Sequence, residues 1–444
     1  MKQWHVTHRS GRLAVLLLTL AACLGDSDTA LGPFPGRALG LRLERIVAIG
    51  DGFLAGERDG ALYRGGQDLS IPALFAAHAG VTDFSQPLIS DPGLATAGEN
   101  GGRLTLVSTQ PPVIERTTTS GVLLDPDRPG PYNNLSVPGA LLSEAPTAQS
   151  LGTSIQGNRF YDIVLRGRGT STEQAVELEA TFVLLWLGTS DVLTFARAGG
   201  EPELAPGLPT PEATFALIYE DILDQLLPLT DQIALFNIPD VTRLPFLNTV
   251  PPVAINPETG EPFTITVLER VVDPLTGDTL SVQRQVPVPL RGERGPLASS
   301  DLVSLEARPL LDVGIGVPIQ QGGLGVPLPD RFVLDRDEQT LARDAIAGYN
   351  AIIAGLASEH GLALVDVRSI VDTIQDHGLI TDGVLLTGEF VTGQGYSLDG
   401  SHFTAKAYGV ITNRLLEAVN ARYGSRLPAI RTSDLPGVPL VSFP

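Results

Sequence analysis

The chain has 444 residues, which is enough for one large domain or two ordinary domains with a sizeable core. Hydrophobic residues make up 43% of it and charged residues 18%, a balance typical of a globular protein and not of a disordered one. The formal net charge of −20 argues against nucleic acid as a partner and against electrostatic binding to an anionic membrane surface.

The N-terminus has the pattern of a secretory signal. Lys2, Arg9 and Arg12 precede an apolar run at 13–20, which is too short to be a permanent transmembrane helix. The run leads into Leu-Ala-Ala-Cys, which ends at Cys23. This is the chain's single cysteine, so an internal disulfide is excluded.

The residues around Cys23 resemble a bacterial lipobox, which implies that this cysteine is acylated after cleavage and anchors the protein to a membrane. An ordinary apolar role in the signal segment is the alternative. Leu24 follows, where an aspartate resembles an inner-membrane retention signal in bacterial lipoproteins. Its absence favours the outer membrane of the cell envelope. We therefore expect a lipoprotein signal peptide at 1–22 and a flexible tether at 23–42.

Beyond the tether, segments typical of buried strands alternate with segments typical of amphipathic helices. Continuous apolar runs predict strands at 46–49, 182–187, 233–236 and 362–365. Helical spacing and end signals predict helices at 71–80, 171–178, 211–229, 335–361 and 404–423. This alternation predicts a parallel sheet with right-handed crossovers.

Residues 248–330 interrupt the alternation. Turn signals at 256–260 and 273–278 separate segments whose alternating pattern predicts a β-hairpin. We expect a β-rich insertion that lies beside the main sheet and is not an independent domain.

Four short motifs occur in an order that resembles the SGNH/GDSL hydrolases. The turn Gly50-Asp51-Gly52 resembles the block in which Gly-Asp-Ser carries the nucleophilic serine, with Gly52 at the serine's position. Gly139, the segment 188–191 and the segment 399–402 resemble the second, third and last blocks.

The resemblance covers most of residues 43–440, which we expect to form one SGNH-hydrolase-like domain. It implies an α/β fold, a three-layer α/β/α sandwich of flavodoxin-like type with a mainly parallel sheet of about five strands. In such sheets, ligands bind beyond the carboxyl ends of the strands, where Gly52 is expected.

Asp399 and His402 match the Asp-x-x-His motif of the family, so the resemblance implies that they are catalytic. Three-residue spacing on a turn lets the carboxylate reach the imidazole, fix its tautomer and stabilise its cation. A helix-capping or surface role for His402 is the alternative. Ser401, inside the same turn, is expected to stabilise it.

The resemblance also implies an oxyanion hole formed by Gly52, Gly139 and Ser190. The two glycines would supply main-chain N–H donors. Ser190 stands where the family has an asparagine. Its hydroxyl can donate a hydrogen bond, but it is shorter than a carboxamide and rotates more freely.

Gly52 offers no hydroxyl, so no covalent acyl-enzyme can form there and the ordinary serine mechanism is expected to be disabled. Two readings stay open. The chain is either a non-catalytic pseudoenzyme that binds an acylated lipid or glycan, or an active esterase that uses water with His402 as general base. In both, the resemblance implies an acyl-ester lipid or an acetylated glycan as the ligand.

No cofactor or metal is expected. The histidines outside the signal segment show no ligand spacing and come without a second cysteine, and neither a P-loop nor a dinucleotide fingerprint is present.

Overall fold

The computed structural model describes residues 40–109, 112–272, 274–275 and 278–438. The predicted signal peptide, Cys23 and most of the tether lie outside the described residues. The end of the tether is described and contacts the domain: the main-chain N–H of Arg42 donates to Oε1 of Gln232 at 2.7 Å, and its guanidinium pairs with Asp231 at 2.9 Å. The chain is therefore held against the domain from this point.

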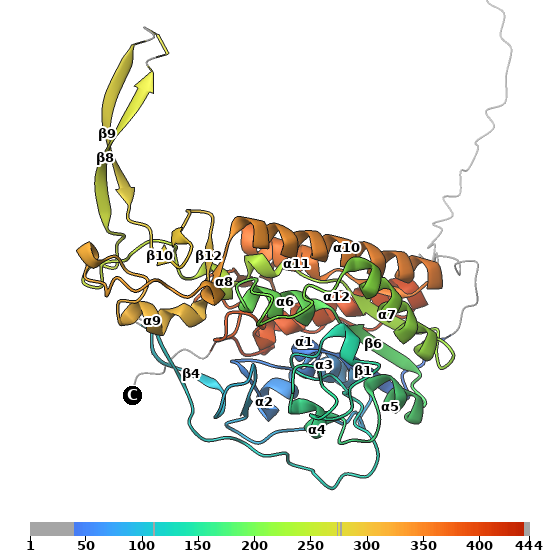
Figure 1. The fold of residues 1–444 in the computed structure, drawn as a ribbon. Helices are drawn as coiled ribbons and strands as arrows, with labels where there is room; N and C mark the ends of the chain where they lie inside the picture. Colours follow the sequence, from blue (N-terminus) through green and yellow to red (C-terminus); the bar gives the residue numbers. More distant parts are fainter. Residues whose placement is uncertain (1–39, 110–111, 273, 276–277, 439–444) are drawn as a thin grey trace, which may run out of the picture. The chain divides into compact units, whose positions relative to one another are not determined.

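A sheet of four parallel strands lies at the centre of the domain (Figure 1). In spatial order they are β1 (Ile46–Gly50), β6 (Phe182–Trp186), β7 (Ile233–Phe236) and β14 (Ala363–Val365). All four predicted strands are confirmed. Nearly every strand residue is buried, which explains why the runs are continuously apolar and do not alternate.

A fifth segment runs beside the free edge of β1, so the predicted five strands appear as four strands and one irregular neighbour. Ala48 forms an isolated parallel bridge with Asn134. Leu135 N donates to Ala48 O at 2.8 Å, and Val137 N donates to Gly50 O at 2.9 Å. The chain leaves β1 toward this edge and later returns to β6 on the other side. The carboxyl end of β1 is thus a topological switch point, the usual place for a ligand site.

Helices cover the sheet in two layers, which confirms the predicted three-layer α/β/α class. On one side, α3 (Ile71–His78) packs on α12 (Ala405–Tyr423), and Phe182 of the sheet contacts Phe75 and Tyr423 of these helices. On the other, α7 (Glu212–Leu226) packs on α10 (Arg336–His360). Two aromatic rings, Phe215 and Tyr349, stack there with centroids 3.8 Å apart.

Helix α10 begins and ends where the sequence predicts. Asp335 accepts from Glu338 N at 3.0 Å, and the Glu338 carboxylate accepts from Asp335 N at 2.8 Å, which forms a capping box. Gly361 ends the helix with φ +63°, a conformation that favours glycine.

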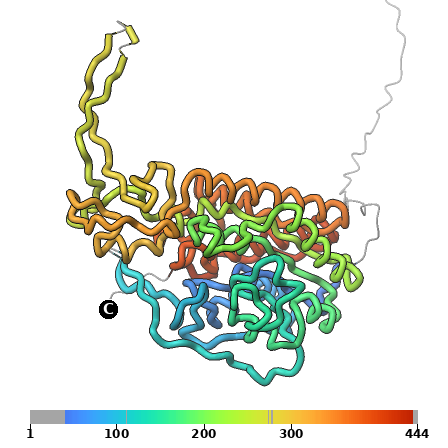
Figure 2. The backbone as a smooth tube through the Cα atoms, viewed as in Figure 1, coloured from blue at the N-terminus to red at the C-terminus, as the bar shows by residue number. Residues whose placement is uncertain are grey.

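The predicted hairpin in the insertion is confirmed as β8 (Thr264–Val272) and β9 (Thr279–Pro287), whose residues are almost all exposed (Figures 1 and 2). Next to it, a small cluster that includes Val250, Val303 and Leu328 is separate from the main core. The insertion therefore adds its own limited apolar packing.

Apart from α5, which the sequence predicts at 171–178, the remaining elements are short or were not predicted. The helices are α1 (Gly52–Ala55), α2 (Arg64–Gln67), α4 (Phe160–Val164), α5 (Ser171–Glu177), α6 (Thr189–Arg197), α8 (Pro245–Asn248), α9 (Arg308–Asp312) and α11 (Val367–Asp376). The strands are β2 (Ala61–Leu62), β3 (Leu94–Ala95), β4 (Leu104–Thr109), β5 (Pro112–Arg116), β10 (Arg291–Gly292), β11 (Gly295–Pro296), β12 (Leu302–Val303), β13 (Val333–Leu334), β15 (Leu379–Thr381) and β16 (Val384–Leu386). Within the described part of the chain, no helix combines the length and apolar character needed to cross a bilayer.

Candidate active site

The turn after β1 folds back on itself and carries an acidic side chain over Gly52. Asp51 caps α1 by accepting from Phe53 N at 3.1 Å, and Gly56 ends this single turn with φ +82°. Glu57 N then donates to Gly52 O at 2.9 Å. This closed turn places the side chain of Glu57 directly beside Gly52.

The carboxylate of Glu57 occupies the space that a side chain at position 52 would need. A Cβ atom built on Gly52 would lie against Oε2 of Glu57 and 2.7 Å from Nε2 of His402, both too close for an ordinary contact. The other oxygen of Glu57, Oε1, accepts a hydrogen bond from the Thr96 hydroxyl. Glycine is therefore the residue that fits at 52 while Glu57 holds this position.

Asp399 and His402 come together as predicted, at the turn before α12. Oδ2 of Asp399 lies 3.3 Å from Nδ1 of His402. Its Oδ1 accepts from the main-chain N–H groups of Ser401 and His402, each at 2.7 Å, and Oδ2 accepts from Gly60 N at 2.9 Å and from the hydroxyl of Ser397 at 3.0 Å. The carboxylate is thus fixed from several directions.

Electrostatics favour the charged forms of both residues. Burial alone would raise the pKa of Asp399, but His402 and the hydrogen bonds outweigh it and hold this pKa far below its usual range. Burial alone would lower the pKa of His402, but the carboxylates of Glu57 and Asp399 outweigh it, so the net shift of this pKa is upward. The imidazole lies between two carboxylates, and both favour its protonated form.

His402 therefore differs from the general base of a serine hydrolase. Its Nε2 lies 3.4 Å from Oε2 of Glu57, and the ring packs on Phe53 with centroids 4.7 Å apart. A protonated imidazole has no lone pair with which to accept a proton from water or serine. The upward shift of its pKa therefore reduces the share of His402 that is neutral and can accept a proton.

Both hydrogen-bond donors of Ser190 are directed at Asp51 and not at an oxyanion position. Both its N–H, at 3.1 Å, and its hydroxyl, at 2.9 Å, donate to Oδ2 of Asp51. Burial raises the pKa of Asp51 to about 6, and the hydrogen bonds from Phe53 and Ser190 offset only part of the rise. The predicted oxyanion role of Ser190 would require it to release this buried carboxyl group.

Gly139 lies at the end of the segment that flanks β1, two residues after Val137, which is bonded to Gly50 O. Its φ of +73° favours glycine, and an added Cβ would meet only Nδ2 of Asn158, at 3.7 Å. Gly52, Gly139 and Ser190 thus follow three neighbouring strand positions, the arrangement expected of the family blocks.

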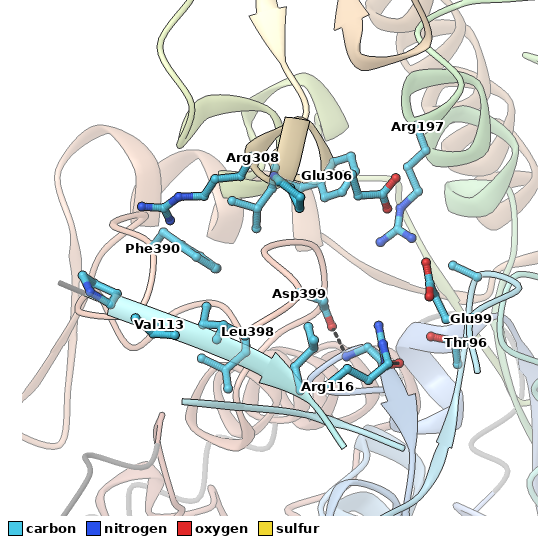
Figure 3. A pocket seen from close by; sticks show the side chains of 18 of the residues that line it. Thr96, Glu99, Val113, Arg116, Arg197, Glu306, Arg308, Phe390, Leu398 and Asp399 are labelled. Carbon is cyan, nitrogen blue, oxygen red and sulfur yellow. Dashed lines mark hydrogen bonds between the residues drawn. The ribbon is translucent and has the colours of Figure 1, made fainter. Parts of the chain in front are cut away.

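A pocket of about 530 Å³ lies next to Asp399 and Thr96 (Figure 3). Thr96, which binds Glu57, and Asp399, which pairs with His402, belong to its wall. Gly52 and His402 do not. Most of the lining is apolar, as is usual for small-molecule sites, and Arg116, Arg197 and Arg308 add positive charge.

Sequence reasoning missed Glu57, Thr96 and Arg197. One signal for Glu57 was present: it is the first charged residue after an apolar turn, FLAG, that directly follows the expected nucleophile position. Thr96 comes from a distant loop, and Arg197 from the end of a helix that the sequence did not predict.

Within the part of the chain that the structure describes, no group of three histidine, cysteine or acidic side chains is arranged to hold a metal ion.

No protein-family model and no curated protein matches the chain. Similar solved structures include an alpha/beta hydrolase enzyme from the metagenome of Lake Arreo, Spain, at a TM-score of 0.36 and 11% identity, covering 87% of this chain and 98% of the other. A variant acetyl xylan esterase from Geobacillus stearothermophilus has a TM-score of 0.35 and 10% identity, and the match covers 86% of this chain and 97% of the other. Phospholipase A1 from Streptomyces albidoflavus has a TM-score of 0.31 and 12% identity, and the match covers 85% of this chain and 98% of the other. Likeness at this level says nothing about chemistry, which rests on this chain's own residues.

Proposed function

We propose that this chain is a relative of the SGNH/GDSL hydrolases that binds an acylated ligand, a lipid or a glycan, without turning it over through a serine nucleophile. Three observations support this. The motifs occur in the order of the family, Gly52, Gly139 and Ser190 lie at one edge of the sheet, and Asp399 pairs with His402. The ordinary mechanism has lost its nucleophile at position 52.

One observation carries the proposal: the Glu57 carboxylate fills the nucleophile's place and faces Nε2 of His402 at 3.4 Å. A serine mechanism needs a hydroxyl there and a neutral imidazole to accept its proton. Here the position holds a carboxyl group, and that group favours the protonated form of the imidazole. Removal of a serine nucleophile alone costs about 10⁶ in turnover in comparable enzymes.

The alternative is an esterase in which His402 activates water directly. Two features weigh against it. Burial alone would lower the pKa of His402, but Glu57 and Asp399 outweigh it and the net shift is upward. A higher pKa leaves a smaller share of the imidazole neutral and able to act as a base. The side chain is also buried and lies outside the pocket wall. If such activity exists, it should grow with rising pH.

We further propose that the protein is a lipoprotein acylated on Cys23 and held at the outer membrane. The lipobox resemblance and the absence of aspartate after the cysteine support this. Metabolic labelling with an alkyne-tagged fatty acid tests it. The label should enter the native chain and be absent from a Cys23→Ala variant; equal labelling of both would contradict the proposal.

The proposed absence of turnover is tested by assaying the full chain in detergent with short-chain aryl esters and with methyl decanoate. We expect no turnover above that of a His402→Gln variant. Turnover that exceeds background and is lost in the variant would overturn the non-catalytic proposal.

A further inference from the structure

Three arginines line the pocket without an acidic partner. Among the ion pairs of the described residues, none includes Arg116, Arg197 or Arg308. Arg116 and Arg197 are partly buried, where a charge is screened less by water than on the open surface. They indicate a place for an anion that the protein does not itself supply.

Two of these arginines are held in position by contacts that leave their charge uncompensated. Arg197 donates to the hydroxyl of Ser401 at 3.1 Å and lies over the ring of Phe246, 4.7 Å from its centroid. Arg116 donates to the carbonyl oxygens of Gly60 at 3.0 Å and Gly102 at 2.8 Å. Each partner is neutral, and each guanidinium has further donors. Their side chains are therefore pre-positioned at low entropic cost for an anion.

The acids of the same pocket are placed differently. Glu99, Glu306 and Asp312 are exposed, whereas Arg116 and Arg197 are partly buried. The charge of an exposed group is screened by water and salt, while a partly buried charge is screened much less. Asp399 is buried, but its carboxylate is committed to His402 and to main-chain donors. None of these four acids forms an ion pair with Arg116 or Arg197 in the described part of the chain.

An apolar wall continues from this charged end. Figure 3 shows Leu398, Val113 and Phe390 along the pocket on the side away from Arg197, which comes from α6, while Arg116 comes from β5. A ligand that fills both parts must combine an anionic group with an apolar chain.

We propose that the pocket binds a single-chain amphiphile with one anionic head group, a carboxylate or a phosphate monoester. The head group lies between Arg197 and Arg116, and the chain lies along Leu398 and Phe390. This rests on the proposed binding function, and it specifies a free acid as the ligand where the family resemblance implies an ester. Guanidinium groups bind both kinds of oxyanion through paired N–H donors.

The test is calorimetric titration of the full chain in a non-ionic detergent below its micelle concentration. The ligands are decanoate, decyl phosphate, methyl decanoate and decyltrimethylammonium, which share the chain and differ in the head group. We expect the two anions to bind at least roughly tenfold more tightly than the ester and the cation, and added salt to weaken only the anions. The tighter of the two anions identifies the head group.

Variants locate the site. Arg197→Gln and Arg116→Gln should each weaken decanoate binding about tenfold, the usual scale for a lost charge-assisted contact. Arg331→Gln is the matched control, because Arg331 also lies over an aromatic ring, 4.6 Å from the Phe332 centroid, but is not part of the pocket. Thermal unfolding monitors whether each variant folds, and the head-group series on the native chain decides the question even if one does not.

Equal binding of methyl decanoate and decanoate, or no binding of either anion, would overturn this inference and leave the non-catalytic proposal standing. Hydrolysis of methyl decanoate would have the opposite effect, because it contradicts the non-catalytic proposal whatever the anions do.

Discussion

Oε2 of Glu57 lies 3.4 Å from Nε2 of His402, in the space that any side chain at position 52 would enter. The space beside Gly52 is therefore not empty. Glu57, five positions along the chain, fills it, and its carboxylate raises the pKa of the histidine that faces it. Restoring the serine alone would place its Cβ against this carboxylate.

The first prediction concerns the charge of His402. Glu57→Gln keeps the size of the side chain and removes one of the two carboxylates that raise the pKa of His402, so this pKa should fall. Nitrogen-15 NMR titration of histidine-labelled protein measures it, with His402→Gln to assign the signal. Glu258→Gln, an exposed change in the insertion, is the control. If His402 titrates at the same pH in the native and Glu57→Gln proteins, Glu57 does not raise its pKa, and the account of the site is contradicted.

The second prediction follows from Asp51, whose pKa is raised by burial to about 6 from 3.8. Because the folded state binds this proton more tightly than the unfolded state, the stabilisation is full below about pH 4 and is lost as the pH rises through about 6. The difference in unfolding free energy between the native chain and Asp51→Asn should therefore fall by about 3 kcal/mol from pH 3.5 to pH 7. Urea unfolding at several pH values measures this. A constant difference would mean that Asp51 is ionised normally.

The third prediction tests what Ser190 does. Ser190→Ala removes the hydroxyl that donates to Asp51 at 2.9 Å, so it should lower the unfolding free energy by about 2 kcal/mol at pH 8, where the carboxyl group is charged. Ser299→Ala, on the exposed surface, should change it by less than about 0.5 kcal/mol. Equal stability of the two variants would remove the structural role assigned to Ser190.

The fourth prediction concerns the β8–β9 hairpin. Its residues are almost all exposed, and the main-chain bond from Val288 N to Phe263 O, at 2.8 Å, closes its base. Replacing residues 265–286 with a short glycine turn should leave the melting temperature within about 2 °C, because little apolar surface is lost from the core. A large drop in melting temperature would show that the hairpin supports the domain.

Local rules explain why much of the fold is predictable. The strands of the sheet are buried on both faces, so their sequences stay apolar throughout, and α10 has both a capping box and a glycine stop. The fifth strand was harder to predict from the sequence, because the segment around Asn134 pairs with β1 through a few hydrogen bonds and forms no regular strand. Helix α6 was missed because it begins after Gly188, which offers no side-chain cap, so no start signal marks it.

The candidate site also combines local contacts, which the sequence predicts, with contacts between distant segments, which it does not. The pair Asp399 and His402 is local, three residues apart on one turn, and the sequence predicts it. The place of Glu57 depends on the αL conformation of Gly56 and on Thr96, which is contributed by a loop far along the chain. The orientation of Ser190 depends on the need of a buried Asp51 for donors. No pattern within one segment specifies such contacts.

The most direct test of the central claim is covalent labelling by a fluorophosphonate, together with hydrolysis of p-nitrophenyl acetate, in three variants: Gly52→Ser, Glu57→Ala and the two changes combined. We expect both single variants to be inert, the first because Glu57 still fills the site and favours the protonated form of His402. The combined variant should react with the probe and exceed the native rate by at least roughly 100-fold, well short of the ~10⁶ that a serine contributes in a complete site. The same activity from Gly52→Ser alone, or none from the combined variant, would contradict the claim that Glu57 occupies and disables the nucleophile position.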